Sequence, residues 1–222
     1  FAVATVMASY GSTPRTSGSR MIVKQDRSII GTIGGGLVEA RVMDACADLI
    51  ERNVCRLDRF VLSREHKDDF DMICGGDMTV LMETFQPSPE LVSIYKLLTD
   101  LESRGLKGCL VSQVNGNPQS EFKMSKSLVQ EGTVLAGHPV PDSMLNWLQK
   151  KRFAGSTPVS HNQGLEAFII EPLVKQDTLF IFGAGHVGLC LAQMAHLTGF
   201  NTVVIDDRKE FANTDRFPNA NA

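Results

Sequence analysis

The sequence predicts an α/β protein in which a mixed α/β N-terminal domain is followed by a Rossmann-type, parallel-sheet C-terminal domain that is incomplete in this chain. Three observations support this fold class. Of the 222 residues, 43% are apolar and 21% are charged, which is typical of globular proteins with one or two domains. Strand-like and helix-like apolar spacings alternate along the chain. A glycine fingerprint between an apolar strand and an apolar helix then marks the start of the C-terminal domain.

The N-terminal domain is expected over residues 1–90. Runs rich in Val, Ile, Met and Thr, bounded by Gly, Pro and Ser, predict strands, and apolar residues at helical spacing predict one helix. The expected strands are 1–10, 20–25, 28–33, 56–63 and 78–85, and the expected helix is 36–53.

The next region, 91–176, continues the α/β pattern. Residues 90–104 predict a helix that Gly105 ends, and apolar runs predict strands near 107–114 and 165–171. The stretch between these two strands is rich in Gly, Pro and polar residues, so we expect loops that pass over an edge of the sheet.

The C-terminal domain, 177–222, opens with the fingerprint. An apolar strand leads to Gly183, Gly185 and Gly188, a helix follows, and a second apolar strand ends at Asp206. Such glycines let a pyrophosphate approach the helix N-terminus, and the acid can bind a ribose hydroxyl. Alternatively, the glycines serve helix–strand packing alone and no nucleotide binds. Because only a short stretch follows the second strand, we expect an incomplete domain whose exposed strand edge favours a homo-oligomer.

Composition argues against several classes of protein. A net charge of −3, with Lys and Arg scattered along the chain, disfavours nucleic acid as a partner. No apolar run reaches the roughly 18 residues of a membrane-spanning helix and no secretory signal opens the chain, so we expect a cytoplasmic protein without a membrane partner. The five cysteines are odd in number and contain no CxxC pair, which argues against disulfides and a zinc site.

Three short segments of the N-terminal domain are rich in small and polar residues and form a candidate site. The first segment, 11–19, contains Ser12, Thr13 and Arg15, whose hydroxyl groups and guanidinium suit an oxyanion such as phosphate. The alternative is a solvated connection between two strands.

The second segment is the glycine run. Gly34, Gly35 and Gly36 lead directly into the predicted helix, so unpaired N–H groups and the positive end of the helix dipole face whatever lies in front. Glu39 falls within the apolar arc of that helix, where a carboxylate needs a partner. It either accepts hydrogen bonds from the first turn, as in a capping box with Gly36 as N-cap, or binds a ligand.

The third segment is Cys74, Gly75 and Gly76. A thiol before two glycines, in a turn between a charged stretch and a strand, is placed for exposure rather than for packing. Cys74 is therefore the predicted reactive thiol. The cysteines predicted to be inert lie on apolar helix faces or in a strand, and they are Cys46, Cys109 and Cys190.

Four motifs resemble the xanthine dehydrogenase accessory factor family (XdhC/CoxI), in this order and at comparable intervals: GSTPRTSGSRMIV, GTIGGGLVEA, MICGGDMTVLME and FIFGAGHVGLCLA. The resemblance implies a cytosolic maturation factor that binds molybdenum cofactor and supports its sulfuration by a cysteine desulfurase. Such a factor inserts the cofactor into a xanthine dehydrogenase-type molybdenum hydroxylase. The resemblance also implies that the C-terminal domain is a Rossmann fold.

Carried to this sequence, the resemblance implies cofactor contacts in all three segments. Molybdopterin offers a phosphate, a hydrogen-bonding pterin edge and a metal dithiolene. Arg15 and the helix amides suit the phosphate, Glu39 suits pterin N–H groups, and Cys74 suits a contact to molybdenum or the carriage of sulfur. The implied cofactor-binding residues are Ser12, Thr13, Arg15, Gly34, Gly35, Gly36, Glu39, Gly75 and Gly76.

Two other functions fit parts of the sequence. An NAD(P)-dependent oxidoreductase would bind its nucleotide at 183–188 and its substrate on the first domain, although the sequence offers no obvious pair of proton donors. A nucleotide-sensing regulatory module would bind its ligand at the same turn and use the N-terminal loops as a protein interface. The cofactor-binding function requires instead that the three N-terminal segments meet in space.

Overall fold

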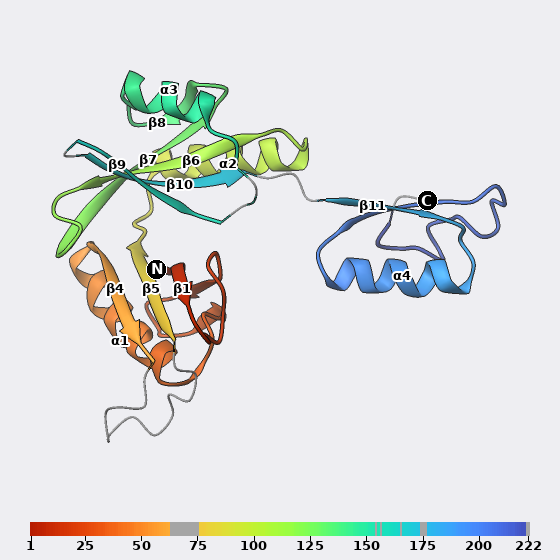
Figure 1. Ribbon diagram of the computed structural model, residues 1–222, viewed down its shortest axis with the longest axis horizontal. Helices are drawn as coiled ribbons and strands as arrows, with labels where there is room; N and C mark the ends of the chain where they lie inside the picture. Colours follow the sequence, from red (N-terminus) through yellow and green to blue (C-terminus); the bar gives the residue numbers. More distant parts are fainter. Residues whose placement is uncertain (63–75, 154, 156, 165, 174–176, 221–222) are drawn as a thin grey trace. The chain divides into compact units, whose positions relative to one another are not determined.

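The computed structural model of the chain describes residues 1–62, 76–153, 155, 157–164, 166–173 and 177–220. The chain folds into two compact units, residues 1–174 (unit 1) and 175–222 (unit 2). Helices and strands occur in both units, which confirms the predicted α/β class (Figure 1). None of the helices in the described part of the chain has the length and hydrophobicity that crossing a bilayer requires.

Unit 1 is built on one sheet. Its ten described strands pair in the order β3-β2-β1-β5-β4-β7-β6-β10-β9, with β8 paired to β7, and every described pair is antiparallel. The strands are β1 (Ala2–Tyr10), β2 (Arg20–Val23), β3 (Ile29–Gly31), β4 (Cys55–Val61), β5 (Asp77–Thr84), β6 (Gly108–Asn115), β7 (Glu121–Gln130), β8 (Thr133–Gly137), β9 (Val159–Gln163) and β10 (Glu166–Leu173).

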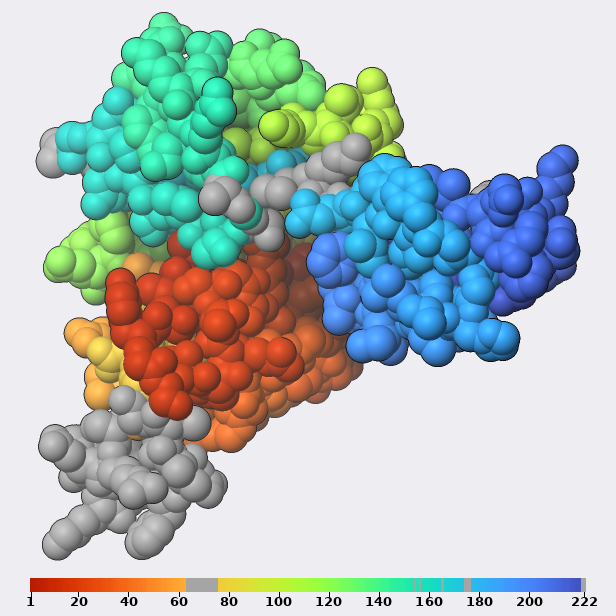
Figure 2. All heavy atoms as spheres, turned by 45° about the vertical axis from the view of Figure 1, so that its right-hand side comes forward, coloured from red at the N-terminus to blue at the C-terminus, as the bar shows by residue number. Residues whose placement is uncertain are grey.

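Three helices are described in unit 1: α1 (Gly36–Arg52), α2 (Pro89–Ser103) and α3 (Asp142–Lys150). The start of α2 follows from its sequence, because Ser88 accepts a hydrogen bond from the N–H of Leu91 at 3.1 Å and Pro89 occupies the first helical position. In Figure 2 the surface of the β1-to-α1 region (red to orange) adjoins that of β6 to β10 (green to cyan), as expected for one continuous sheet.

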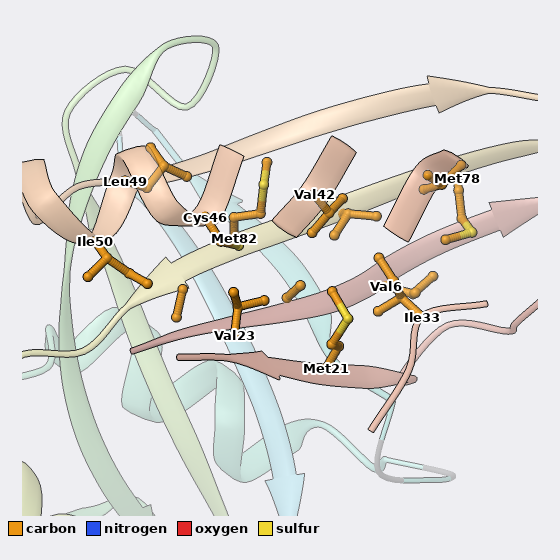
Figure 3. Close-up of a cluster of buried hydrophobic side chains, with 14 of the residues drawn as sticks. Val6, Met21, Val23, Ile33, Val42, Cys46, Leu49, Ile50, Met78 and Met82 are labelled. Carbon is orange, nitrogen blue, oxygen red and sulfur yellow. The ribbon is translucent and has the colours of Figure 1, made fainter. Parts of the chain in front are cut away.

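The side chains of β1 alternate between two environments. Ala2, Ala4 and Val6 are fully buried under α1, whereas Val3 and Met7 lie on the opposite face of the sheet, where coverage is partial. Figure 3 shows how the apolar side chains of α1 meet those of the strands in this core. The helix contributes Val38, Val42, Cys46, Leu49 and Ile50.

The prediction of loops between 114 and 165 was wrong. This stretch forms β7, β8, α3 and β9. In β7 the apolar residues Phe122, Leu128 and Val129 are buried, and so is Lys126, which is paired with carboxylates. The polar residues that suggested loops therefore alternate with core residues or are buried in ion pairs, so composition alone misled the prediction.

Unit 2 contains the strands β11 (Thr178–Phe182) and β12 (Asn201–Ile205), joined by α4 (His186–Leu197). The two strands pair in parallel, with Thr178 opposite Asn201 and Phe182 opposite Ile205. A parallel pair connected by a helix is the first part of a Rossmann-type fold, as the glycine fingerprint predicted.

Candidate functional site

The first predicted segment meets the second. The loop between β1 and β2 places Pro14 and Arg15 beside Gly34, so that a Cβ atom placed on Gly34 would lie 2.7 Å from the Cβ and Cγ atoms of Pro14. Gly34 also has a φ of 132°, a conformation that side chains rarely adopt. Close approach and backbone conformation both require glycine here, so the contact between the two segments depends on it.

The third segment meets the same loop through its last residue. A Cβ atom placed on Gly76 would collide with the carbonyl oxygens of Tyr10 and Ser12 and would lie 2.9 Å from Cγ2 of Thr13. The described parts of the three segments therefore converge around Ser12–Arg15. Cys74 and Gly75 lie outside the described residues, so their predicted roles stay predictions.

The glycine run adopts left-handed conformations at all three positions. The φ angles of Gly34, Gly35 and Gly36 are 132°, 79° and 63°. The N-cap of α1 is Gly35, one residue before the predicted position, and it has no side chain with which to cap the first turn. No described atom would lie within 4 Å of a Cβ atom on Gly35 or Gly36. Within the described part of the chain the start of α1 therefore faces open space, which suits an anion bound by backbone amides.

Glu39 turns toward the glycine run and holds it in place. Its Oε2 atom accepts hydrogen bonds from the hydroxyl of Thr32 at 2.6 Å, from the N–H of Ile33 at 3.3 Å and from the N–H of Gly35 at 3.1 Å. These bonds are the first-turn role that the sequence left as one alternative. All three end on Oε2, so a ligand would be bound through Oε1, and that second role stays a prediction.

The loop at 12–15 presents its polar groups outward. Thr13 donates a hydrogen bond from its hydroxyl to the carbonyl oxygen of Arg15 at 3.0 Å, which stabilises the turn. Ser12 and Arg15 are exposed, and Arg15 forms no ion pair with any residue that the structure describes. Its guanidinium is therefore available to bind an anion beside the glycine run.

The glycines of unit 2 differ in what requires them. Gly183 has a φ of 105° and donates a hydrogen bond from its N–H to Ile205 at 2.8 Å. A Cβ atom on Gly188 would collide with the carbonyl oxygen of Gly183, whereas one on Gly185 would contact no described atom within 4 Å. Close helix–strand packing accounts for Gly188, whereas Gly183 and Gly185 both have an open side, among the described residues, that a nucleotide could approach.

Asp206, the predicted ribose ligand, is already bonded on both oxygens. It accepts from Nε and Nη2 of Arg208 at 2.9 and 3.0 Å and from the N–H groups of Ala184 at 2.7 Å and of Arg208 at 3.0 Å. Arg208, followed by the Ala184 amide, holds the pKa of this carboxyl well below its usual range. A ribose hydroxyl would have to displace some of these bonds, so nucleotide binding stays a prediction.

Three cysteines are inert thiols because of their surroundings. Burial raises the pKa of Cys46 to about 12, and it raises those of Cys55 and Cys109 to about 11. Cys190, which was expected on an apolar helix face, is exposed in unit 2. No group of three or more His, Cys, Asp or Glu side chains in the described ranges is arranged to hold a metal ion.

Both ends of the chain match sequence models of one family. Residues 1–60 match the XdhC and CoxI family, and residues 179–222 match the XdhC Rossmann domain. The chain is therefore similar to this family at both ends. The matched regions contain the glycine run and α1 in unit 1 and the β11–α4–β12 part of unit 2.

Two curated relatives are similar to this chain. The uncharacterized protein YqeB of Escherichia coli (strain K12) is 39% identical over 94 residues, which are 42% of this chain and 17% of YqeB. A probable xanthine dehydrogenase subunit of Bacillus subtilis (strain 168) is 24% identical over 218 residues, which are 98% of this chain and 63% of that protein. The chain thus spans less than two thirds of either relative.

A crystal structure described as a xanthine dehydrogenase from Bacillus halodurans has a similar fold. The TM-score is 0.75 at 22% sequence identity, and the match covers 99% of this chain and 62% of that chain. At this level of identity the similarity establishes the fold alone.

A buried charge cluster in unit 1 was not predicted from the sequence. Lys126 lies 3.0 Å from Glu83 and 3.5 Å from Glu171, and Glu171 also pairs with Arg20. The sequence carried one signal for it, since Glu83 and Lys126 interrupt the apolar runs MTVLMETF and MSKSLV. A charge inside an apolar strand needs a partner, but the sequence does not say which strand supplies it.

Proposed function

We propose that the protein is a xanthine dehydrogenase-associated accessory factor that binds molybdenum cofactor, supports its sulfuration and delivers it to a molybdenum hydroxylase of the xanthine dehydrogenase type. The observation that carries the proposal is the convergence of Gly34 and Gly76 on the loop at 12–15, next to the open start of α1. Similarity to the XdhC and CoxI family over residues 1–60 and a relative named as a probable xanthine dehydrogenase subunit support the same function.

The residues around the start of α1 fit the polar parts of a molybdopterin. The amides of the first turn, at the open faces of Gly35 and Gly36, would bind the phosphate together with Arg15, whose loop packs on Gly34. Glu39 would accept from pterin N–H groups through Oε1, while Oε2 keeps the loop in its conformation. When bound, the cofactor supplies a dithiolene-held molybdenum, which is the metal that a hydroxylase partner requires.

Cys74 is the proposed thiol for contact with molybdenum or for sulfur received from a cysteine desulfurase. The support is its place in the sequence, two residues before Gly76, which packs on Ser12 and Thr13. Burial and raised pKa values make Cys46, Cys55 and Cys109 poor candidates for this role. Self-association of the chain is a further part of the proposal, and light scattering of the purified protein tests it.

Co-expression with the cofactor pathway tests cofactor binding. The chain is purified from cells that make molybdenum cofactor, and bound molybdenum and oxidised-pterin fluorescence are measured per chain. Gly36→Asp fills the open space with a negative charge, so we expect the pterin content to fall roughly tenfold or more, which corresponds to about 1.4 kcal/mol. Gly164→Asp is the matched control, because Gly164 has a φ of 62° and an equally open Cβ position in a turn after β9.

Three outcomes decide the proposal. Pterin that is lost in Gly36→Asp and kept in Gly164→Asp supports it. Pterin that binds while Cys74→Ala lowers only the molybdenum or sulfur content supports the thiol's role. Absence of pterin from the wild-type chain, together with tight NADH binding, would replace the proposal with the oxidoreductase.

A further inference from the structure

Unit 1 contains a cavity that the cofactor-binding residues do not use. It has a volume of about 500 Å³ and lies on the face of β1, β2 and β5 opposite α1. Its walls are largely apolar and include Val3, Met7, Ile22, Leu81, Phe85, Tyr95 and Ile169. A concave, mostly apolar cavity with a few polar groups is the usual form of a small-molecule site.

The polar groups of the cavity are neighbours across the strands. Thr5 lies opposite Arg20 on β2, and Val3 lies opposite Glu83 on β5. Glu171 reaches the same cavity from β10 and forms an ion pair with Arg20. The cavity therefore collects one guanidinium and two carboxylates from β2, β5 and β10.

Lys126 is not among the lining residues, but its ammonium lies next to the two carboxylates and balances their charge. Its ammonium is within 3.0 Å of Glu83, 3.5 Å of Glu171 and 2.9 Å of the hydroxyl of Ser112. The side chains of Lys126 and Glu83 are 3% and 9% exposed, so both are held by the cluster rather than by water. Burial would lower the pKa of Lys126, but the two carboxylates outweigh it and raise the pKa, so Lys126 is charged.

The charge balance restricts the ligand. Arg20 and Lys126 are matched by Glu83 and Glu171, so a ligand with a net charge would find no unmatched counter-charge in this cluster. A neutral ligand can instead bond to the Arg20–Glu171 pair, which offers a donor and an acceptor side by side. The edge that complements this pair is a lactam, whose carbonyl accepts from the guanidinium and whose N–H donates to the carboxylate.

The aromatic wall favours a flat ligand. Phe85 and Tyr95 lie edge to face with their ring centroids 6.1 Å apart, and both line the cavity together with aliphatic side chains. We propose that this cavity binds a planar heterobicycle with a lactam edge, either an oxopurine or a free pterin, with Arg20 and Glu171 reading the lactam. The site is separate from the open start of α1 and does not depend on the proposed cofactor function.

Calorimetric titration of the purified 222-residue chain tests the proposal. Hypoxanthine carries the lactam, and 1-methylhypoxanthine keeps the ring and carbonyl but has lost the lactam N–H. We expect hypoxanthine to bind with a Kd below roughly 1 mM and at least about tenfold more tightly than its methylated analogue, because the methyl group replaces the N–H that donates to Glu171 and places an apolar group against the carboxylate. A parallel titration with pterin assigns the source, since the tighter of the two lactams is the better ligand.

Arg20→Met removes the donor and should weaken hypoxanthine binding about tenfold or more. Arg104→Met is the matched control, because Arg104 is an exposed arginine that pairs with Asp100 on α2 away from the cavity, and its binding should stay within about twofold of wild type. Equal affinity for hypoxanthine and 1-methylhypoxanthine, or no saturation by either lactam, overturns the proposal. The comparison of hypoxanthine with 1-methylhypoxanthine uses the wild-type chain, so it tests the proposal even if Arg20→Met does not fold. Cofactor content is measured separately, so either proposal can fail alone.

Discussion

The glycine turns before α1 and before α4 are similar in order, but they differ in which glycine is sterically required. In each turn a strand ends in glycines and a helix begins. Before α1, the glycine with no room for a side chain is Gly34, which packs on a neighbouring loop, and the glycines at the helix start face open space. In α4, the one with no room is Gly188, which packs on the carbonyl of Gly183 in its own turn. The first turn therefore requires its glycine for a contact with another loop, and the second requires its glycine for a contact within the turn itself.

The acids of the two turns also differ in how many of their oxygens are bonded. Glu39 accepts from Ile33 and Gly35 through a single oxygen, whereas Asp206 accepts through both oxygens from Ala184 and Arg208. Both carboxylates stabilise a glycine turn by binding its backbone amides. Only Glu39 keeps an oxygen without a bond among the described residues. A glycine turn with an acid nearby is therefore not by itself a nucleotide site, because both oxygens of the acid can already accept hydrogen bonds from the turn.

The largest expected effect separates the two roles of glycine within unit 2. Gly188→Ala places a methyl group against the backbone carbonyl of Gly183, which cannot move without disrupting the turn, so unit 2 should lose about 3 kcal/mol of stability. Gly185→Ala is the control, because Gly185 has an ordinary φ of −74° and open space at its Cβ position, and it should change stability by less than about 0.5 kcal/mol. Hydrogen exchange of the β12 amides measures both. Equal losses in the two variants would contradict the packing role of Gly188.

The next effect concerns the acid of the first turn. Glu39→Ala leaves the hydroxyl of Thr32 and the amides of Ile33 and Gly35 without their acceptor, so unit 1 should lose about 2 kcal/mol. Glu51→Ala on the exposed side of the same helix is the control and should be nearly neutral. Guanidinium denaturation followed by the fluorescence of Trp147, the single tryptophan, reports on unit 1. A neutral Glu39→Ala would show that the loop does not need the carboxylate and would leave ligand binding as its role.

Local signals predicted most of the elements that form the site. The glycine run, the periodicity of 36–53 and the alternation in 1–10 correspond to the observed α1 and β1 within one residue at each end. These features depend on neighbours a few residues apart, which the sequence shows directly. The inward position of Glu39 followed from the same helical spacing.

Contacts between distant segments could not be predicted in the same way. The packing of Gly76 on Tyr10 and Ser12 depends on the pairing of β1 with β5, in which Tyr10 lies opposite Asp77. The burial of Lys126 likewise depends on carboxylates from β5 and β10. Sequence periodicity gives the face of a strand but not its neighbour, so the convergence of the loops and the charged cavity wall emerged only from the structure.

The smallest expected effect is a pH dependence confined to unit 2. Because Arg208 and the amide of Ala184 lower the pKa of Asp206 in the folded state, this carboxyl contributes stability at pH values above its unfolded pKa of about 3.9. The contribution is lost as the pH falls from that value through the lower folded pKa. The melting temperature of Asp206→Asn should therefore lie below that of wild type at pH 6, and the gap should narrow progressively below about pH 4.

Amide signals of 178–205 in NMR spectra recorded on heating measure this difference in melting temperature. Asp207→Asn, at a neighbouring side chain that is 97% exposed, should show almost no gap at any pH. A gap for Asp206→Asn that is equally large at pH 3 and pH 6 would mean that packing, and not the charge of Asp206, holds the α4 turn closed.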